Sequence, residues 1–371
     1  MRNLISLLTV VIVFAGCKKN NRTPIQDKFI DYGYVSAVSS VAVVSTALMV
    51  YHQGEIFVAS NDGVWKIGLT EKIWRRAGLA GKKVNVLYSH PEIAGKFFAA
   101  IESGGPTEKS LYISADAGVT WQAAASPVFD SRNNIYESFS DIRARPGHPN
   151  QIFANLSGIT ISVSKDGGET WNRQNYNTDS YFGINCVINF REGSAGEIYQ
   201  GAEAPLDHAW LGKYSIDATD PVKLGTLDQF IGKNYEWENR RPNCLETFRS
   251  NPGVLYAGLE GALIKIEGTQ WKYIFKSTGT DILPYAYITG VWLNPSNKKH
   301  IIFGGGVNGT NTSLSLFETY DEGVTITHIN DKLGMTDPAV IDIIATENYP
   351  AILVRDNGNE RRMRLLLYKY N

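Results

Sequence analysis

The sequence has no surplus of either charge: 36 basic and 37 acidic side chains give its 371 residues a formal net charge of −1. A protein that binds nucleic acid needs basic residues to neutralise the phosphates, so nucleic acid is excluded as a partner. The chain also lacks C-x-x-C, H-E-x-x-H, EF-hand and phosphate-binding glycine motifs, so we expect no metal site and no cofactor. Its 43% hydrophobic and 20% charged residues are typical of a folded globular chain.

Cysteine is scarce, with three residues in the chain. Cys186 and Cys244 lie in similar strings, I-N-C-V and P-N-C-L. A disulfide and two separate buried thiols both fit the sequence, because similar positions in neighbouring units need not lie within disulfide reach.

The first residues form a short positive start followed by an apolar run, Leu4 to Phe14, which is too short to span a bilayer. The run ends in F-A-G-C and resembles the lipobox of bacterial lipoproteins, whose cysteine is lipidated and becomes the N-terminus. The resemblance implies a signal peptide over residues 1–16, a lipidated Cys17 and a polar tether over residues 17–28. It also implies an outer-membrane protein, facing the periplasm or the cell surface and attached through its lipid alone. An ordinary signal peptide or a buried first strand is the alternative.

Glycine and aromatic residues are abundant, with 35 Gly, 8 Trp and 19 Tyr, which indicates many short strands joined by tight turns. An apolar strand that ends in small residues recurs about every 49 residues, the period of a four-stranded propeller blade. The copies are Glu55–Ser60, Lys96–Ala100, Gln151–Asn155, Glu197–Gly201, Val254–Gly258, Ile301–Gly305 and Ala351–Val354.

The sequence therefore predicts an all-β fold, a single β-propeller over residues 29–371 with seven blades, six or eight being the alternatives. The blades are expected to begin near Ser39, Val84, Tyr136, Phe182, Arg241, Tyr285 and Pro338. The segment Phe29 to Val35 precedes the first blade and can add a strand to the last, which would remove exposed sheet edges.

A second repeat has the pattern S-x-D-x-G-x-T-W, at Ser114–Trp121 and Ser164–Trp171, with a degenerate copy at Thr319–Ile326 and a truncated one at Ser60–Trp65. The Asp can accept from turn amides, the Gly permits positive φ, and the Trp packs on a neighbouring sheet. The pattern resembles the BNR or Asp-box repeat of sialidases, sortilin-type receptors, xyloglucanases and photosystem assembly factors. The resemblance implies architectural roles, remote from the ligand face, for Asp116, Trp121, Asp166, Trp171 and Asp321.

We expect a ligand at the mouth of the central channel formed by loops that enter the inner strands and loops between second and third strands. The longest predicted insertion is Ala202 to Arg240. Aromatic rings interleaved with charged groups suit a carbohydrate, whose C–H faces stack on rings while its hydroxyls need polar partners. The candidate ligand-binding residues are Trp210, Tyr235, Trp237, Arg240, Arg241, Tyr181 and Tyr285. Packing between blades is the alternative for each aromatic residue.

Three classes of function fit the sequence, and it does not decide between enzyme and binder. The first is a lipoprotein that binds a glycan. The second is a glycoside hydrolase using a carboxylate pair, or a lyase using Arg240 or Arg241 with Tyr235 or His208. The candidate carboxylates are Glu137, Asp141, Glu203 and Glu238. The third is a non-catalytic assembly factor that binds a protein.

Two activities of the resembling families are disfavoured. Sialidases carry a substrate-binding arginine before the first Asp box, and no arginine lies between Phe29 and Asp62. Xyloglucanases place their acids between two propellers, whereas this chain supplies one.

Overall fold

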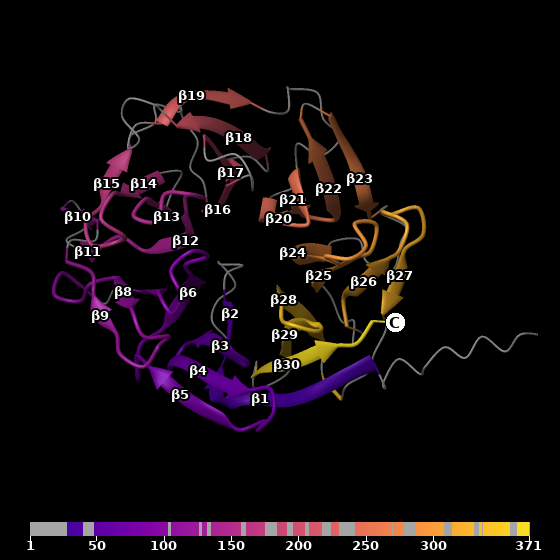
Figure 1. Ribbon diagram of the computed structural model, residues 1–371, viewed down its shortest axis with the longest axis horizontal. Helices are drawn as coiled ribbons and strands as arrows, with labels where there is room; N and C mark the ends of the chain where they lie inside the picture. The colour runs from indigo at the N-terminus through magenta and orange to yellow at the C-terminus, as the bar shows by residue number, and fades with distance from the viewer. Residues whose placement is uncertain are drawn as a thin grey trace, which may run out of the picture.

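A computed structural model describes residues 28–39, 48–102, 105–125, 128–131, 135–156, 161–174, 184–190, 196–204, 208–216, 224–229, 242–268, 270–277, 286–307, 314–329, 334–335, 337–356 and 362–370. Seven four-stranded antiparallel sheets stand in a ring around a central channel (Figure 1). The predicted all-β fold with seven blades is confirmed. Within the described residues, no helix is long and apolar enough to cross a membrane.

Each blade runs from an inner strand at the channel to a fourth strand at the rim. The inner strands are β2 (Met49–His52), β6 (Val84–Ser89), β12 (Phe139–Ala144), β16 (Ile184–Phe190), β20 (Pro242–Phe248), β24 (Ala286–Leu293) and β28 (Pro338–Ala345). The second strands are β3 (Glu55–Ser60), β7 (Phe97–Ile101), β13 (Ile152–Leu156), β17 (Glu197–Ala204), β21 (Asn251–Leu259), β25 (Ile301–Val307) and β29 (Pro350–Asp356).

The third strands are β4 (Gly63–Gly68), β8 (Leu111–Ser114), β14 (Ile161–Ser164), β18 (His208–Ile216), β22 (Ala262–Glu267), β26 (Leu316–Thr319) and β30 (Arg362–Tyr368). The fourth strands are β5 (Trp74–Gly78), β9 (Gln122–Ala123), β15 (Asn172–Gln174), β19 (Leu224–Gln229), β23 (Gln270–Lys276), β27 (Thr327–Ile329) and β1 (Phe29–Ser39). A two-stranded hairpin, β10 (Phe129–Asp130) with β11 (Ile135–Tyr136), precedes the third blade.

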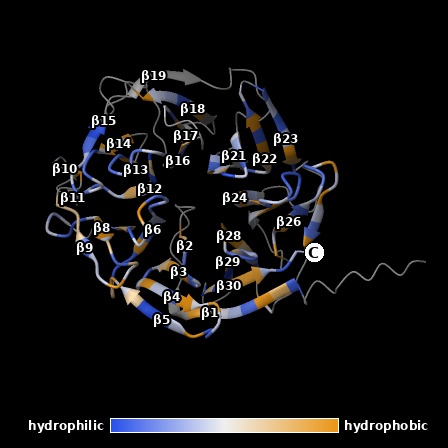
Figure 2. Ribbon diagram, in the orientation of Figure 1, coloured by the Kyte–Doolittle hydropathy of each residue, from blue (hydrophilic) through white to orange (hydrophobic). Residues whose placement is uncertain are grey.

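The second strands are continuously apolar because neighbouring blades cover both of their faces. All five residues of β7 and of β13 are buried. Aromatic side chains fill the space between blades, with ring centroids 5.1 Å apart for Phe57 and Phe97 and 5.0 Å apart for Phe153 and Phe190. Fourth strands meet solvent, and the short β15 is hydrophilic throughout (Figure 2).

Glycines in the second strands allow the inner strands to approach closely at β-bulges. A Cβ atom added to Gly305 would lie 1.2 Å from the carbonyl oxygen of Tyr287, and one added to Gly258 would lie 2.5 Å from that of Ile288. These are close approaches of backbone, which only glycine permits.

Side chains of inner strands tie neighbouring blades together at several junctions. Oδ2 of Asp141 accepts a hydrogen bond from the Ile188 amide (2.9 Å), so β12 is joined to β16. Oδ2 of Asp342 accepts from the amides of Leu48 (3.0 Å) and Met49 (2.9 Å), which joins the last blade to the first.

The ring is also closed by the first strand, because β1 pairs antiparallel with β30 in the last blade (Figure 1). The sequence predicted this strand as far as Val35, and it extends to Ser39. The first blade therefore does not begin near Ser39 as predicted, since its inner strand starts at Met49. The boundary was misplaced because the end of β1 and the start of β2 both lie in an almost unbroken run of apolar and small residues, Val35 to Val50.

The predicted insertion Ala202 to Arg240 is wrong as a single long loop. Most of blade four lies within it, since β17 ends at Ala204 and both β18 and β19 follow. Blade four carries no Asp box after its third strand, so the motif that marked other blades gave no signal there.

Candidate ligand site in the central channel

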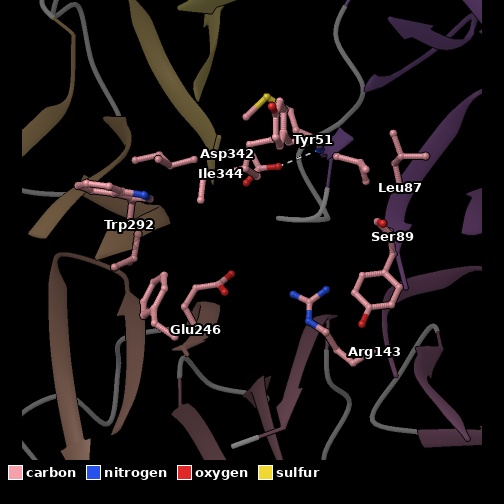
Figure 3. Close-up of a pocket in the computed structure, with 15 residues that line it drawn as sticks. Tyr51, Leu87, Ser89, Arg143, Glu246, Trp292, Asp342 and Ile344 are labelled. Atoms are coloured by element: carbon pink, nitrogen blue, oxygen red, sulfur yellow. Dashed lines mark hydrogen bonds between the residues drawn. The ribbon is translucent and has the colours of Figure 1, made fainter. Parts of the chain in front are cut away.

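A cavity of about 350 Å³ lies in the channel, where the inner strands end (Figure 3). Six inner strands each contribute a residue near their last positions: Tyr51, Tyr88, Arg143, Glu246, Trp292 and Ile344. Three of them occupy equivalent positions in their blades, because each pairs with the central aromatic residue of its second strand. These pairs are Tyr88 with Phe98, Arg143 with Phe153 and Glu246 with Tyr256. The blade repeat thus builds a ring of side chains around the cavity.

The cavity lies at the same end of the propeller as the Asp boxes. The Asp-box amide of Ala117 donates to the carbonyl of Gly95 (2.8 Å), and the amide of Gly167 donates to that of Asn150 (2.9 Å). Gly95 and Asn150 belong to the turns that follow inner strands, at the end where the cavity lies. The sequence had placed the ligand at the other mouth, among the loops that enter the inner strands.

Arg143 reaches the cavity from β12, where the carboxyl groups of Asp141, Glu246 and Asp342 interact with its charge. Its Nη1 lies 2.7 Å from Oδ1 of Asp141 and donates to the Ile142 carbonyl (3.1 Å), while the guanidinium lies over the ring of Tyr88. Burial lowers the pKa of Arg143, but Asp141 and other carboxylates outweigh burial and raise it overall, so the side chain is charged at any relevant pH.

Asp342 lines the cavity, and its neighbours in the sequence are apolar. Burial, together with the charge of Glu246, raises the pKa of Asp342 to about 8, although amides of Leu48 and Met49 oppose the shift. Its carboxyl is therefore mostly protonated at neutral pH. Burial also raises the pKa of Asp141, against the opposing effect of Arg143.

The cavity combines flat apolar faces with two charged groups of opposite sign. Tyr51 and Trp292 belong to its lining, Trp292 being only 4% exposed, and Arg143 and Glu246 point into the cavity (Figure 3). Its volume falls in the range of about 300–1,000 Å³ found for sites that bind small molecules or parts of polymers. Such a site can hold a ring by stacking and orient it by hydrogen bonds.

The Asp-box residues lie in tight turns, as their motif implies. Oδ1 of Asp116 accepts from the Thr120 amide (2.8 Å) and Oδ2 from the Thr120 hydroxyl (2.7 Å), and these bonds lower the pKa of Asp116 to about 2. Asp166 and Asp321 make the equivalent bond to an amide four residues on, at 2.9 and 2.8 Å. Nε1 of Trp121 donates to the Ala77 carbonyl in the preceding blade (2.9 Å), whereas Nε1 of Trp171 bonds within its own turn.

Of the candidate catalytic carboxylates, the structure describes the side chains of Glu137 and Asp141, and neither lines the cavity. Glu137 is buried just before β12 and pairs with Arg173 (2.7 Å), and Asp141 serves as the tie to β16. The backbones of Glu203 and Trp210 lie in β17 and β18, and their side chains lie outside what the structure describes. The remaining candidates also lie outside the described residues: Cys17, Tyr181, Tyr235, Trp237, Glu238, Arg240, Arg241 and Tyr285.

Cys244 is a free, buried thiol that donates to the Ile288 carbonyl (Sγ to O, 3.6 Å). Among the described residues, no group of three or more His, Cys, Asp or Glu side chains is arranged to hold a metal ion. The cavity is therefore the feature of the described chain that we consider as a ligand site.

The sequence matches no protein-family model and no curated protein. Several solved structures share the fold. The GH74 enzyme of Niastella koreensis is 17% identical, with a TM-score of 0.61, over 91% of this chain and 55% of that one. The extracellular domain of BT4673 from B. thetaiotaomicron, a putative one-component system, is 12% identical, with a TM-score of 0.61, over 93% and 40%. YCF48 from Cyanidioschyzon merolae is 12% identical, with a TM-score of 0.57, over 92% and 98%.

These likenesses establish the fold alone. The chain is a seven-bladed propeller similar in structure to GH74 enzymes, BT4673 and YCF48, and it spans about half the length of the GH74 enzyme. Proteins with this fold differ widely in function, so function must be argued from the site.

Proposed function

We propose that this chain is a lipid-anchored outer-membrane propeller that binds a glycan in the cavity at the Asp-box end of its channel. The observation that carries the proposal is the ring of inner-strand side chains, in which Tyr51 and Trp292 flank the charged ends of Arg143 and Glu246. A sugar needs this combination, because its ring presents apolar C–H faces and its rim presents hydroxyls. The lipobox-like string that ends at Cys17 supports the anchor.

The arrangement favours a binder over a hydrolase. Hydrolysis needs two carboxyl groups free to act on the bond, one of them an acid. The protonated Asp342, which lines the same cavity as Glu246, meets part of that requirement and keeps the enzyme as a second candidate. Oδ2 of Asp342, however, is held by the amides of Leu48 and Met49, just as Oδ2 of Asp141 is held by that of Ile188. We therefore assign Asp342 to closure of the ring.

The proposal is tested with the full chain in a non-glycosidic detergent, run through affinity gels that contain neutral, acidic or amino polysaccharides. We expect retardation by at least one glycan and no release of reducing ends or unsaturated products. Trp292→Ala should weaken binding by about tenfold or more, because one stacking face is lost. Trp271→Ala, on the fourth strand β23, is the matched control and should leave binding unchanged.

Two results would contradict the proposal. If no polysaccharide is retarded, the glycan function is wrong and a protein ligand becomes the better account, as for YCF48, which has been solved with a D1 peptide bound. If glycan binding is the same in Trp292→Ala as in the unmodified chain, the site lies elsewhere. Release of products would establish the second candidate, the enzyme.

A further inference from the structure

We infer that one side of the Asp-box end of the propeller is a surface that lies on the headgroup region of a lipid bilayer. The surface consists of the turns of blades six, seven, one and two at that end, together with the two chain ends in blade seven, and is called the membrane arc below. This inference rests on the lipid anchor of the proposed function and not on the glycan. Two features carry it: the place where the tether enters the fold, and a set of exposed apolar side chains.

The tether enters the fold at the Asp-box end. Phe29, the first residue of β1, pairs with Tyr368, the last residue of the third strand β30, and third strands run towards the Asp-box turns. The carbonyl of Lys28 is fixed there by a hydrogen bond from the Lys369 amide (2.7 Å). Lys28 is the eleventh residue after Cys17, and a chain of this length spans at most about 40 Å when fully extended. A lipid on Cys17 would therefore hold this end of the propeller close to the bilayer.

Exposed apolar side chains gather at the same end. Among the described residues, five large hydrophobic side chains are exposed, and four of them lie in turns between third and fourth strands: Ile73 (57% exposed), Val119 (74%), Tyr320 (45%) and Val324 (86%). They belong to blades one, two and six, which form one continuous part of the ring with blade seven and its chain ends (Figure 1). Apolar tips around a lipid tether suit insertion among lipid headgroups, because burial of apolar area strengthens binding at a membrane surface.

The Asp-box repeat distinguishes this side of the ring from the opposite one. The sixth position of the motif is Val119 in blade two and Val324 in blade six, but it is Glu169 in blade three. The Asp of all three boxes accepts the same hydrogen bond from the amide four residues on, so the turn itself does not require valine. The carboxylate of Glu169 accepts from the Ala125 amide (3.1 Å) and makes this tip hydrophilic. We therefore assign blade three to the side that stays in water and leaves access to the cavity.

The acidic residues beside the apolar tips have partners within the protein. Glu71 pairs with Arg75 (2.7 Å), and Glu322 pairs with Lys265 and with Lys272 (both 2.7 Å). Their negative charges are thus compensated before the surface meets a membrane. Basic side chains are attracted to the bilayer surface, and three exposed lysines at the same end can reach lipid phosphates: Lys72, Lys298 and Lys299.

The test places a fluorescent probe at single tips of the full lipidated chain, purified from membranes and reconstituted in phosphatidylcholine vesicles. Val119→Cys and Val324→Cys carry an NBD label, and Glu169→Cys carries it at the matched position of blade three. The unmodified chain gives the background from its own cysteines. Nitroxide on the lipid headgroups quenches only probes at the bilayer surface. Apolar groups bound there lie about 5–10 Å deep, so we expect at least about threefold more quenching at the two valine positions than at Glu169.

The outcomes separate the membrane arc from the anchor and from the glycan. A chain that does not float with the vesicles lacks the anchor, which contradicts that part of the proposed function and this inference together. A chain that floats but is quenched equally at the three positions keeps the anchor and overturns the membrane arc. Blue-shifted emission of the valine probes without quenching would show that a second copy of the chain covers the arc, and would overturn it as well. Glycan binding is measured separately in affinity gels, so its failure leaves the inference standing.

Discussion

Asparagine at position 342 should change how the stability of the propeller depends on pH. Asp342 is buried, and its pKa is raised from 3.8 to about 8 by burial and by Glu246. Between these two values the carboxyl is ionised in the unfolded chain and neutral in the folded one. Its contribution to stability is therefore present in full below about pH 4 and is lost as pH rises towards 8.

The Asp342→Asn variant lacks this titration but keeps an amide oxygen that can accept from Leu48 and Met49. One pKa unit corresponds to about 1.4 kcal/mol. The unfolding free energy of Asp342→Asn, minus that of the unmodified chain, should thus rise by about 1.4 kcal/mol per pH unit between pH 5 and 7 and level off above pH 8. Other titrating groups cancel in the difference.

Urea denaturation followed by tryptophan fluorescence at pH 5, 6, 7, 8 and 9 measures this difference. Asp166→Asn is the control: hydrogen bonds from Thr170 outweigh burial and lower the pKa of Asp166, so both states are ionised and the difference should not vary with pH. A flat profile for Asp342→Asn would show that Asp342 is ionised in the folded chain and would refute the reasoning. Asp342→Ala leaves two buried amides without their acceptor, so at each pH it should be about 2–5 kcal/mol less stable than Asp342→Asn.

Three further predictions concern the scaffold and the anchor. Gly305→Ala should destabilise the fold by about 3 kcal/mol or more in urea denaturation, because its Cβ would overlap the Tyr287 carbonyl. Gly196→Ala is the control and should be neutral, because Gly196 has open space around it. Equal effects of the two substitutions would contradict the close approach. Deleting residues 28–39 should leave β30 as an open edge, and light scattering should detect aggregation; a stable monomer would show that closure by β1 is dispensable. Cys17→Ala should move the protein from the membrane fraction to the soluble fraction, and retention in membranes would contradict the lipid anchor.

Sequence patterns predicted the fold because they are local. The apolar second strand and the Asp-box turn each lie within one blade, so every copy can be recognised from a short stretch of sequence. Blade four lacked the Asp box, and its strands β18 and β19 were taken for a loop. The break between β1 and β2 was misplaced because the apolar run that contains it has no strong turn signal.

The cavity was not predicted because its residues come together only when the ring closes. Arg143, Glu246 and Trp292 lie far apart in sequence, each within an inner strand that read as core. The signal that would have found them is alignment of the inner strands by blade. That alignment shows charged residues, Arg143 and Glu246, in two blades at the position that Tyr88 occupies in another.

A crystal structure of the chain with an oligosaccharide from a retarded polysaccharide tests the central claim most directly. We expect sugar density at the Asp-box end of the channel, beside Tyr51, Arg143 and Glu246. Density confined to the opposite mouth of the channel, or to the outer surface of the blades, would contradict it.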